Sequence, residues 1–241
     1  MEKKERIDKI LSMCGFGTRK DVKKIIKEGE VMVNGEVIKD AGYHVLPEVD
    51  EILVFGETLV FKRNIYIMLN KPKGVICATY DKKDKTVVDL LEGEYSHRNL
   101  FPVGRLDKDA EGLILLTDDG MLAHKLLSPK SKVFKEYYVE VEGYLTQEDI
   151  LAFEKGIQLE DFKTQPAELT IIESNKVSKA KVKISEGKFH QIKRMFEALG
   201  KRVVYLKRTA IGALKLDSTL SPGEWRELTD EELKILKENV D

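Results

Sequence analysis

The order of the apolar segments after residue 64 constrains the fold more strongly than any other feature of the sequence. Strand-like runs recur as GLILLT, EYYVEVEGYL, AELTIIES, KAKVKISEG, RVVYLKRTAIG and LKLD. Helical spacing of apolar residues marks only GMLAHKLLS, TQEDILAFEKG, FHQIKRMFEALG and TDEELKILKEN, and these segments do not alternate regularly with the strands. We therefore predict an α+β fold with a mixed, mainly antiparallel sheet and flanking helices, rather than a doubly wound parallel sheet.

A smaller unit is predicted ahead of this sheet. Helical spacing marks RIDKILSMCGFGT and RKDVKKIIKEG, and Thr18 can cap the second helix, which Gly29 ends. Asn34-Gly35 between two short apolar runs predicts a hairpin. We expect two domains, residues 1–60 and residues 61–241, the second opening with two β-rich runs in NIYIMLNKPKGVICAT.

Composition excludes several classes of protein. Apolar residues make up 42% of the 241 residues and charged residues 34%, which is typical of a soluble globular chain and not of a disordered one. No apolar run approaches the ~20 residues that span a bilayer, and we expect no signal peptide. Cys14 and Cys77 are too few for a disulfide framework or a zinc site. These features predict a cytoplasmic protein without membrane attachment.

The net charge of −1 hides two basic segments. Residues 3–27 hold nine basic residues against three acidic ones, and residues 176–208 hold eleven against two. Such concentrations suggest local contact with a polyanion. Lysine-rich helices can equally be solvated faces, so charge alone leaves both interpretations open.

The stretch VGRLDKDAEGLILLTDDG, residues 103–120, is the most unusual segment. Positions 1, 3, 5, 6 and 12 of an EF-hand loop would be Asp107, Asp109, Glu111, Gly112 and Asp118. Position 9 is Leu115, which offers no side-chain oxygen, and Pro102 and Gly104 disfavour the helix that should enter such a loop. A polar turn before a buried strand explains Asp109 and Glu111 better, but it leaves Asp107 unexplained.

Asp107 has a neighbour that suits chemistry. Arg105 and Asp107 are two residues apart, so in an extended segment they share a face. A carboxylate beside a guanidinium stays ionised and hydrogen-bonded. An ionised carboxylate without a second acid nearby suits a nucleophile better than a proton shuttle.

Five segments resemble the RsuA-type pseudouridine synthases. They are YIMLNKPKGVICAT, VGRLDKDAEGLILLTDDG, KEYYVEV, SEGKFHQIKRMFEALG and SPGEWRELTDEE, in the order of that family and over about residues 64–232. The segment ERIDKILSMCGFGTRKDVKKIIKEGEVMVNGEVI separately resembles an S4 RNA-binding domain, with its helix-turn-helix-hairpin order.

The resemblance implies roles for particular residues. The aspartate of G-R-L-D is the family's nucleophile, which maps to Asp107. Tyr137 would stack on the target base, Lys193 would pair with the catalytic aspartate, and Ile192 would be the apolar contact to the base. Arg105 would sit beside Asp107, and Leu106 would help to shape the pocket. The family uses neither metal nor cofactor, so we expect none.

The resemblance also implies a partner, ribosomal RNA. The residues expected to bind RNA are Arg6, Lys9, Arg19, Lys20, Lys23, Lys24 and Asn34. The run Phe189 to Arg194 is similar to that of the small-subunit rRNA enzyme, whereas relatives that act on large-subunit rRNA more often carry an Asn-Arg pair. We therefore expect a monomeric enzyme acting on small-subunit rRNA. A large-subunit target, or a non-catalytic RNA-binding or ribosome-assembly protein, are the alternatives.

Overall fold

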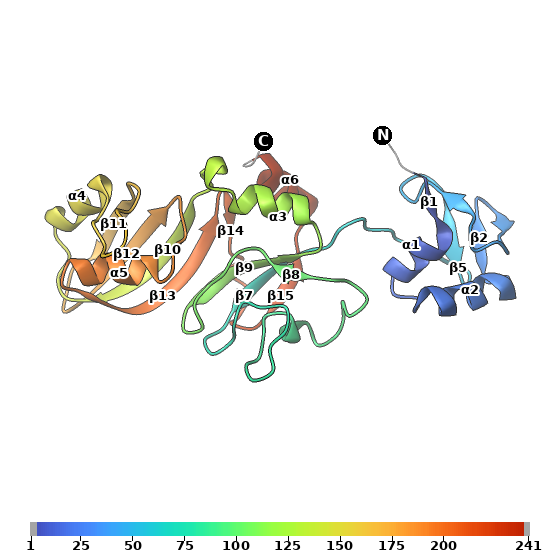
Figure 1. The fold of residues 1–241 in the computed structure, drawn as a ribbon, viewed down its shortest axis with the longest axis horizontal. Coiled ribbons are helices and arrows are strands. Elements are labelled where there is room, and N and C mark those ends of the chain that lie inside the picture. The colour runs from blue at the N-terminus through green and yellow to red at the C-terminus, as the bar shows by residue number, and fades with distance from the viewer. Residues whose placement is uncertain (1–3, 239–241) are drawn as a thin grey trace. The chain divides into compact units, whose positions relative to one another are not determined.

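The computed structural model describes residues 4–238 and divides the chain into two compact units (Figure 1). The first unit is Met1–Asn64 together with Gly93–Asn99, and the second is Ile65–Glu92 together with Leu100–Asp241. The expected boundary at residue 60 therefore lies slightly before the one in the structure. The sequence also did not predict that residues 93–99 belong to the first unit. Arg98 accounts for this, because its Nη1 donates to the carbonyl of Arg63 at 3.2 Å.

The first unit is a small α+β module. Its elements are β1 (Glu5–Arg6), α1 (Ile7–Met13), α2 (Arg19–Glu28), β2 (Val31–Val33), β3 (Glu36–Val37), β4 (His44–Val45), β5 (Ile52–Val54) and β6 (Glu57–Thr58). Thr18 and Asp21 form a capping box at the start of α2, and Gly29 ends that helix in the left-handed conformation. The helices cover a four-stranded antiparallel sheet of order β3-β2-β5-β6 through buried residues that include Ile10, Ile26 and Val54.

The second unit is built on one nine-stranded sheet. Its elements are β7 (Tyr66–Lys71), η1 (Asp89–Leu91), β8 (Phe101–Pro102), β9 (Glu111–Thr117), α3 (Gly120–Leu127), η2 (Pro129–Ser131), β10 (Lys135–Glu142), α4 (Gln147–Lys155), β11 (Glu168–Glu173), β12 (Val177–Ile184), α5 (Gln191–Ala198), β13 (Arg202–Ile211), β14 (Leu214–Lys215), β15 (Trp225–Glu227) and α6 (Asp230–Glu238). The strand order is β11-β12-β10-β13-β9-β7-β15, with β14 on β13 and β8 on β9. Within residues 4–238, β13 with β9 is the one parallel pair of named strands, so the predicted mixed, mainly antiparallel α+β fold is confirmed.

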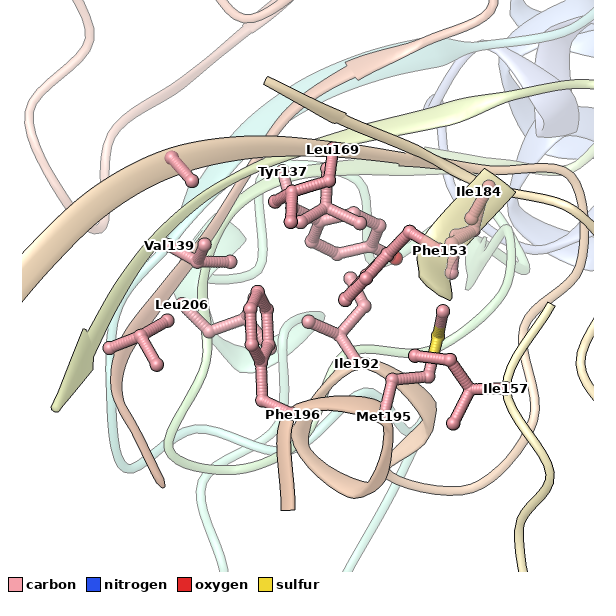
Figure 2. Close-up of a cluster of buried hydrophobic side chains, with 14 of the residues drawn as sticks. Tyr137, Val139, Phe153, Ile157, Leu169, Ile184, Ile192, Met195, Phe196 and Leu206 are labelled. Atoms are coloured by element: carbon pink, nitrogen blue, oxygen red, sulfur yellow. The ribbon is translucent and has the colours of Figure 1, made fainter. Parts of the chain in front are cut away.

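Two apolar cores cover different parts of this sheet. Helices α4 and α5 pack on β10, β12 and β13, and Figure 2 shows Phe153, Ile192 and Phe196 meeting Tyr137 and Val139 there. Helices α3 and α6 cover β7 and β9 through a second cluster (Figure 1). No helix among the described residues is long and apolar enough to cross a membrane.

Two local predictions were wrong. The second β-rich run of NIYIMLNKPKGVICAT forms no strand; it contributes one isolated bridge, from Ile76 to Thr86. Residues 104–107 likewise lie in a loop outside the named strands, and Gly104, with a φ of +80°, turns the chain just before Arg105.

Candidate active site

Asp107 lies in the loop between β8 and β9. The backbone N–H of Leu106 donates to the Sγ of Cys77 at 3.2 Å, and the carbonyl of Asp107 accepts from the N–H of Ala110 at 3.1 Å. Leu106 and Ala110 are buried in the core beneath α5, whereas the Asp107 side chain is 24% exposed. The loop therefore holds one carboxylate at the surface above an apolar base.

The side chain of Lys71 links this loop to the end of β7 by hydrogen bonds. Its side chain, at the end of β7, is fully buried, and its Nζ donates to the carbonyls of Ala110 at 2.7 Å, Pro72 at 3.0 Å and Lys108 at 3.3 Å. Burial lowers the pKa of Lys71. No sequence motif assigns Lys71 a role in the site. A lysine at the end of the apolar run YIMLNK is the one sign in the sequence that it could be buried.

Lys193, on the first turn of α5, faces two carboxylates. Its Nζ lies 3.3 Å from Oδ2 of Asp107, and it donates to both oxygens of Asp109, at 2.7 and 2.9 Å. Burial opposes the charge of Lys193, but the two acids more than offset it and raise its pKa. The hydrogen bond from Lys193 lowers the pKa of Asp109. The sequence analysis had assigned Asp109 to a polar turn, and the structure adds it to the site as the closer partner of Lys193.

His190 lies on the other side of Asp107. Its Nε2 is 3.5 Å from Oδ1 of Asp107, so the two carboxylate oxygens face different nitrogen-bearing side chains. His190 precedes α5 with a φ of +48°, and Phe189 stacks on its ring at 3.8 Å between centroids. We had predicted no part for His190 in the site. Its position next to Ile192 and Lys193 in the sequence was the only available signal.

A pocket of about 70 Å³ opens beside Asp107. Its walls include Arg105, Leu106, Tyr137 and Ile192, all of them predicted site residues. Tyr137 is 7% exposed and Ile192 4% exposed, so each contributes one edge of a mostly buried side chain. Tyr138 points to the opposite face of the sheet, where it meets the ring of Tyr205. One tyrosine of the pair therefore lines the pocket, as strand geometry requires.

Arg105 differs from expectation. Its side chain is exposed, and within residues 4–238 no hydrogen bond or ion pair joins it to Asp107. Both residues nevertheless line the same pocket. Lys193, more than 80 residues away in sequence, supplies the positive charge instead.

The acidic residues of the same stretch have separate partners. Asp118 accepts from the backbone N–H of Ile65 at 2.9 Å, and Asp119 caps α3 by accepting from the N–H groups of Met121 and Leu122. β8 enters the loop where an EF-hand would have a helix. In the described part of the chain, no group of three or more His, Cys, Asp or Glu side chains is arranged to hold a metal ion.

The residues expected to bind RNA lie in the first unit and fall into two groups. Arg19, Lys20, Lys23 and Lys24 are exposed along α2, whose buried side is formed by Val22 and Ile26. The others are engaged within the unit: Arg6 pairs with Asp8, Lys9 pairs with Glu5, and Asn34 bonds to Asp50 and to the backbone of Glu51. The α2 group therefore offers the freer set of cations.

Comparison with known proteins identifies the family. The model of the RNA pseudouridylate synthases matches residues 65–198, and that of the S4 domain matches residues 5–50. The chain belongs to the RNA pseudouridylate synthase family. It is therefore an enzyme, an isomerase, with an N-terminal S4 RNA-binding domain.

Similar proteins match over almost their full length. The RNA pseudouridine synthase YtzG of Bacillus subtilis (strain 168), described as uncharacterized, is 48% identical and aligns over 97% of this chain and 98% of its own. Ribosomal small subunit pseudouridine synthase A of Salmonella typhimurium is 40% identical, over 95% and 98% of the two chains. Ribosomal large subunit pseudouridine synthase B of Bacillus subtilis is 38% identical, over 98% and 97%. A crystal structure of a pseudouridylate synthase has a TM-score of 0.68 and 37% identity, and covers 96% of this chain and 99% of that one.

Proposed function

We propose that the protein converts one uridine of small-subunit ribosomal RNA to pseudouridine, with Asp107 as the nucleophile. The single observation that carries this proposal is the position of the Asp107 carboxylate. It lies against Lys193 in the wall of a pocket that Tyr137 and Ile192 also line. An aspartate next to a cation and an apolar slot is what a reaction on an uncharged base and its sugar needs.

The chemistry is an isomerisation. The bond from C1′ of the ribose to N1 of uracil breaks, a bond from C1′ to C5 forms, and the proton on C5 is replaced by one on N1. No electrons are gained or lost, so the reaction requires no redox cofactor. The carboxylate of Asp107 attacks C1′ and displaces uracil, and the C1′–O bond so formed breaks again when C5 of the rotated uracil attacks C1′. The pocket then holds the detached uracil until it rotates and rejoins the sugar.

The neighbours of Asp107 have distinct parts in this scheme. Lys193 orients the carboxylate, since its Nζ faces Oδ2. Tyr137 stacks on uracil, and Ile192 closes the slot from the α5 side. The target uridine must leave its stack to enter, at a cost of a few kcal/mol that is smallest in a loop or in RNA that has not finished folding. Arg105, exposed in the wall of the pocket, would occupy the space that the base leaves.

A matched pair of variants tests the nucleophile. Asp107→Asn should abolish pseudouridine formation and leave RNA binding nearly unchanged. Asp109→Asn, two residues along the same loop, removes the closer partner of Lys193 and should lower the rate without abolishing it. Both are assayed by tritium release from [5-³H]uridine in rRNA, with thermal melting to confirm folding. An active Asp107→Asn variant would overturn the proposal.

One motif and one sequence comparison favour the small subunit as the source of the substrate. The run from Phe189 to Arg194 is similar to that of the small-subunit enzyme, and the small-subunit relative is slightly more identical to this chain than the large-subunit one. Mapping of pseudouridines in rRNA from cells with and without this gene shows directly which rRNA is the substrate. Loss of a site in large-subunit rRNA alone would contradict the choice of subunit but not the chemistry.

The S4 domain supplies sequence-independent affinity for RNA in this proposal. The four cations along α2 are arranged to contact phosphates, which position an enzyme without reading bases. Replacing Arg19, Lys20, Lys23 and Lys24 by Gln should weaken rRNA binding and flatten its dependence on salt, while the rate at saturating RNA stays near that of the parent. We further propose that the protein acts in the cytoplasm as a monomer.

A further inference from the structure

A second cavity in the catalytic unit joins the Asp107 pocket and is assigned no part by the scheme above. It measures about 610 Å³ and shares Arg105, Tyr137, Gly187 and Lys188 with the smaller pocket. Resting on the proposed function, we propose that this cavity binds a backbone phosphate of the RNA strand that carries the target uridine. Arg208 and Lys135 would be its two buried cationic contacts.

Arg208 is the first reason. It is only 4% exposed, and its Nε donates to the carbonyl of Leu113 at 2.7 Å. Its Nη2 is fully buried and, within residues 4–238, has no hydrogen-bond partner. A buried guanidinium with a single hydrogen bond is unfavourable, and an anion in the cavity that Arg208 lines would give it a further acceptor.

Lys135 is the second reason. It lies at the start of β10, half-buried, and lines the same cavity. Burial and the nearby charge of Arg208 both lower its pKa, so two cations are held close together in poorly hydrated surroundings. In the described part of the chain the side chain of Lys135 has no hydrogen bond or ion pair, and no carboxylate offsets this repulsion directly. A bound anion would relieve it.

The remaining charged groups around the cavity favour the same ligand. Lys132 and Lys188 are exposed at the edge of the cavity. Arg105 lines both this cavity and the pocket of Asp107. Glu186 is the one acidic residue in the wall among the described residues, and its Oε1 already accepts from the N–H of Gln165 at 2.8 Å and from Nε2 of Gln191 at 2.7 Å. The wall therefore presents an excess of positive charge.

The position of the cavity selects a phosphodiester over other anions. Tyr137 lines both spaces, so a nucleotide with its base against Tyr137 has its sugar and phosphate within reach of the cavity. A guanidinium matches two phosphate oxygens at once, and a lysine adds a point charge. Phosphate contacts of this kind fix the register of a strand and so determine which nucleotide faces the nucleophile.

The test measures binding of RNA and does not require activity. The probe is a single-stranded uridine heptamer, titrated onto the full chain by fluorescence anisotropy at several salt concentrations. Lys135→Gln should weaken binding by about tenfold or more at low salt, as expected for one charged hydrogen bond, and should reduce the slope of log K against log salt by about 0.7. Lys234→Gln is the matched control, since it removes one exposed charge on α6, and it should leave both quantities unchanged.

A change on the RNA side completes the experiment. Replacing one phosphate of the heptamer at a time by a neutral methylphosphonate should, at one position, weaken binding to the parent protein and have no further effect on Lys135→Gln. Arg208→Lys, which keeps the charge, should bind better than Arg208→Gln at equal thermal stability. Binding of Lys135→Gln with the affinity and salt slope of the parent would overturn the proposal. So would a methylphosphonate effect that is the same in both proteins.

The outcomes separate the two proposals. If Asp107→Asn retains activity, the proposed mechanism is wrong, but the heptamer measurements still decide whether the cavity binds phosphate. If Asp107→Asn is inactive and Lys135→Gln binds like the parent, only the phosphate site is wrong.

Discussion

Replacing Lys71 by Met should destabilise the catalytic unit and disorder the loop that carries Asp107. Lys71 is fully buried, and its ammonium group donates to three carbonyls. Met is similar in length and fills the same space, so the change removes the donor with little loss of packing. The loss of stability in this variant therefore measures the contribution of the three hydrogen bonds.

The expected loss of stability follows from the three carbonyl groups that accept hydrogen bonds from Lys71. The carbonyl of Lys108 also accepts from the N–H of Gly74 at 2.8 Å, so it keeps a donor in the variant. The carbonyls of Pro72 and Ala110 lose theirs, and each unsatisfied buried acceptor costs about 1–3 kcal/mol. Because Met also avoids the burial of a charge, part of this cost is recovered. We expect a net loss of about 2–4 kcal/mol in the free energy of unfolding.

Trp225 makes the assay specific. It is the only tryptophan of the chain and pairs with Leu69 of β7, the strand that ends in Lys71. Its fluorescence during urea titration therefore reports on the catalytic unit. Lys73→Met is the control: this lysine is exposed and lies 5.0 Å over the ring of Tyr205, so its loss should cost less than about 1 kcal/mol. If Lys71→Met unfolds at the same urea concentration as the parent, the three hydrogen bonds do not stabilise the loop as argued.

Three further predictions concern the same unit. Gly112→Ala should lose more than about 2 kcal/mol of stability, because its φ is +102° and a Cβ there would lie 2.2 Å from the carbonyl oxygen of Arg208. Gly120→Ala, with open space around it, should be neutral in the same urea titration, and equal effects would contradict this reasoning. Hydrogen bonds from the backbone and hydroxyl of Thr219, and then from Arg226, lower the pKa of Asp217 to about 2 from 3.8. The stability from this group is therefore present above pH 4 and is lost as the pH falls toward 2, so the loss of stability in Asp217→Asn should be smaller at pH 2.5 than at pH 7. Tyr137→Phe keeps the ring and should retain more activity than Tyr137→Ala in a tritium-release assay, and the reverse order would argue against stacking.

The fold was largely predictable because local signals and tertiary structure agree. The capping box of Thr18 and the left-handed Gly29 mark α2 in the sequence and in the structure alike. The alternation in KEYYVEV and KAKVKISEG places one face of β10 and β12 in the core. The errors lie where tertiary contacts decide. Nothing local distinguishes residues 75–79 from a strand, and nothing local assigns residues 93–99 to the first unit.

Sequence motifs predict Asp107, Tyr137, Ile192 and Lys193 as site residues, and their part in a reaction stays a prediction. The structure places the first three in the wall of one pocket and Lys193 against Asp107. The pairing of Lys193 with Asp109, the position of His190 and the role of Lys71 depend on how α5, the loop and β7 meet. Spacing along the sequence does not show how these elements contact one another. Arg105 and Asp107 line the same pocket, but among the described residues no hydrogen bond or ion pair joins them, and the spacing of two residues could not show this.

The parallel pairing of β9 with β13 has a mechanical consequence. Only two residue pairs, Lys207 with Glu111 and Arg208 with Gly112, join these strands, and they are the link between the two halves of the sheet. Asp107 precedes β9 on one side of this seam, and Lys193 belongs to the helix that packs on the other. A relative movement of the two halves would change the distance between the carboxylate of Asp107 and the Nζ of Lys193. The contact between these two side chains therefore depends on how the two halves of the sheet meet.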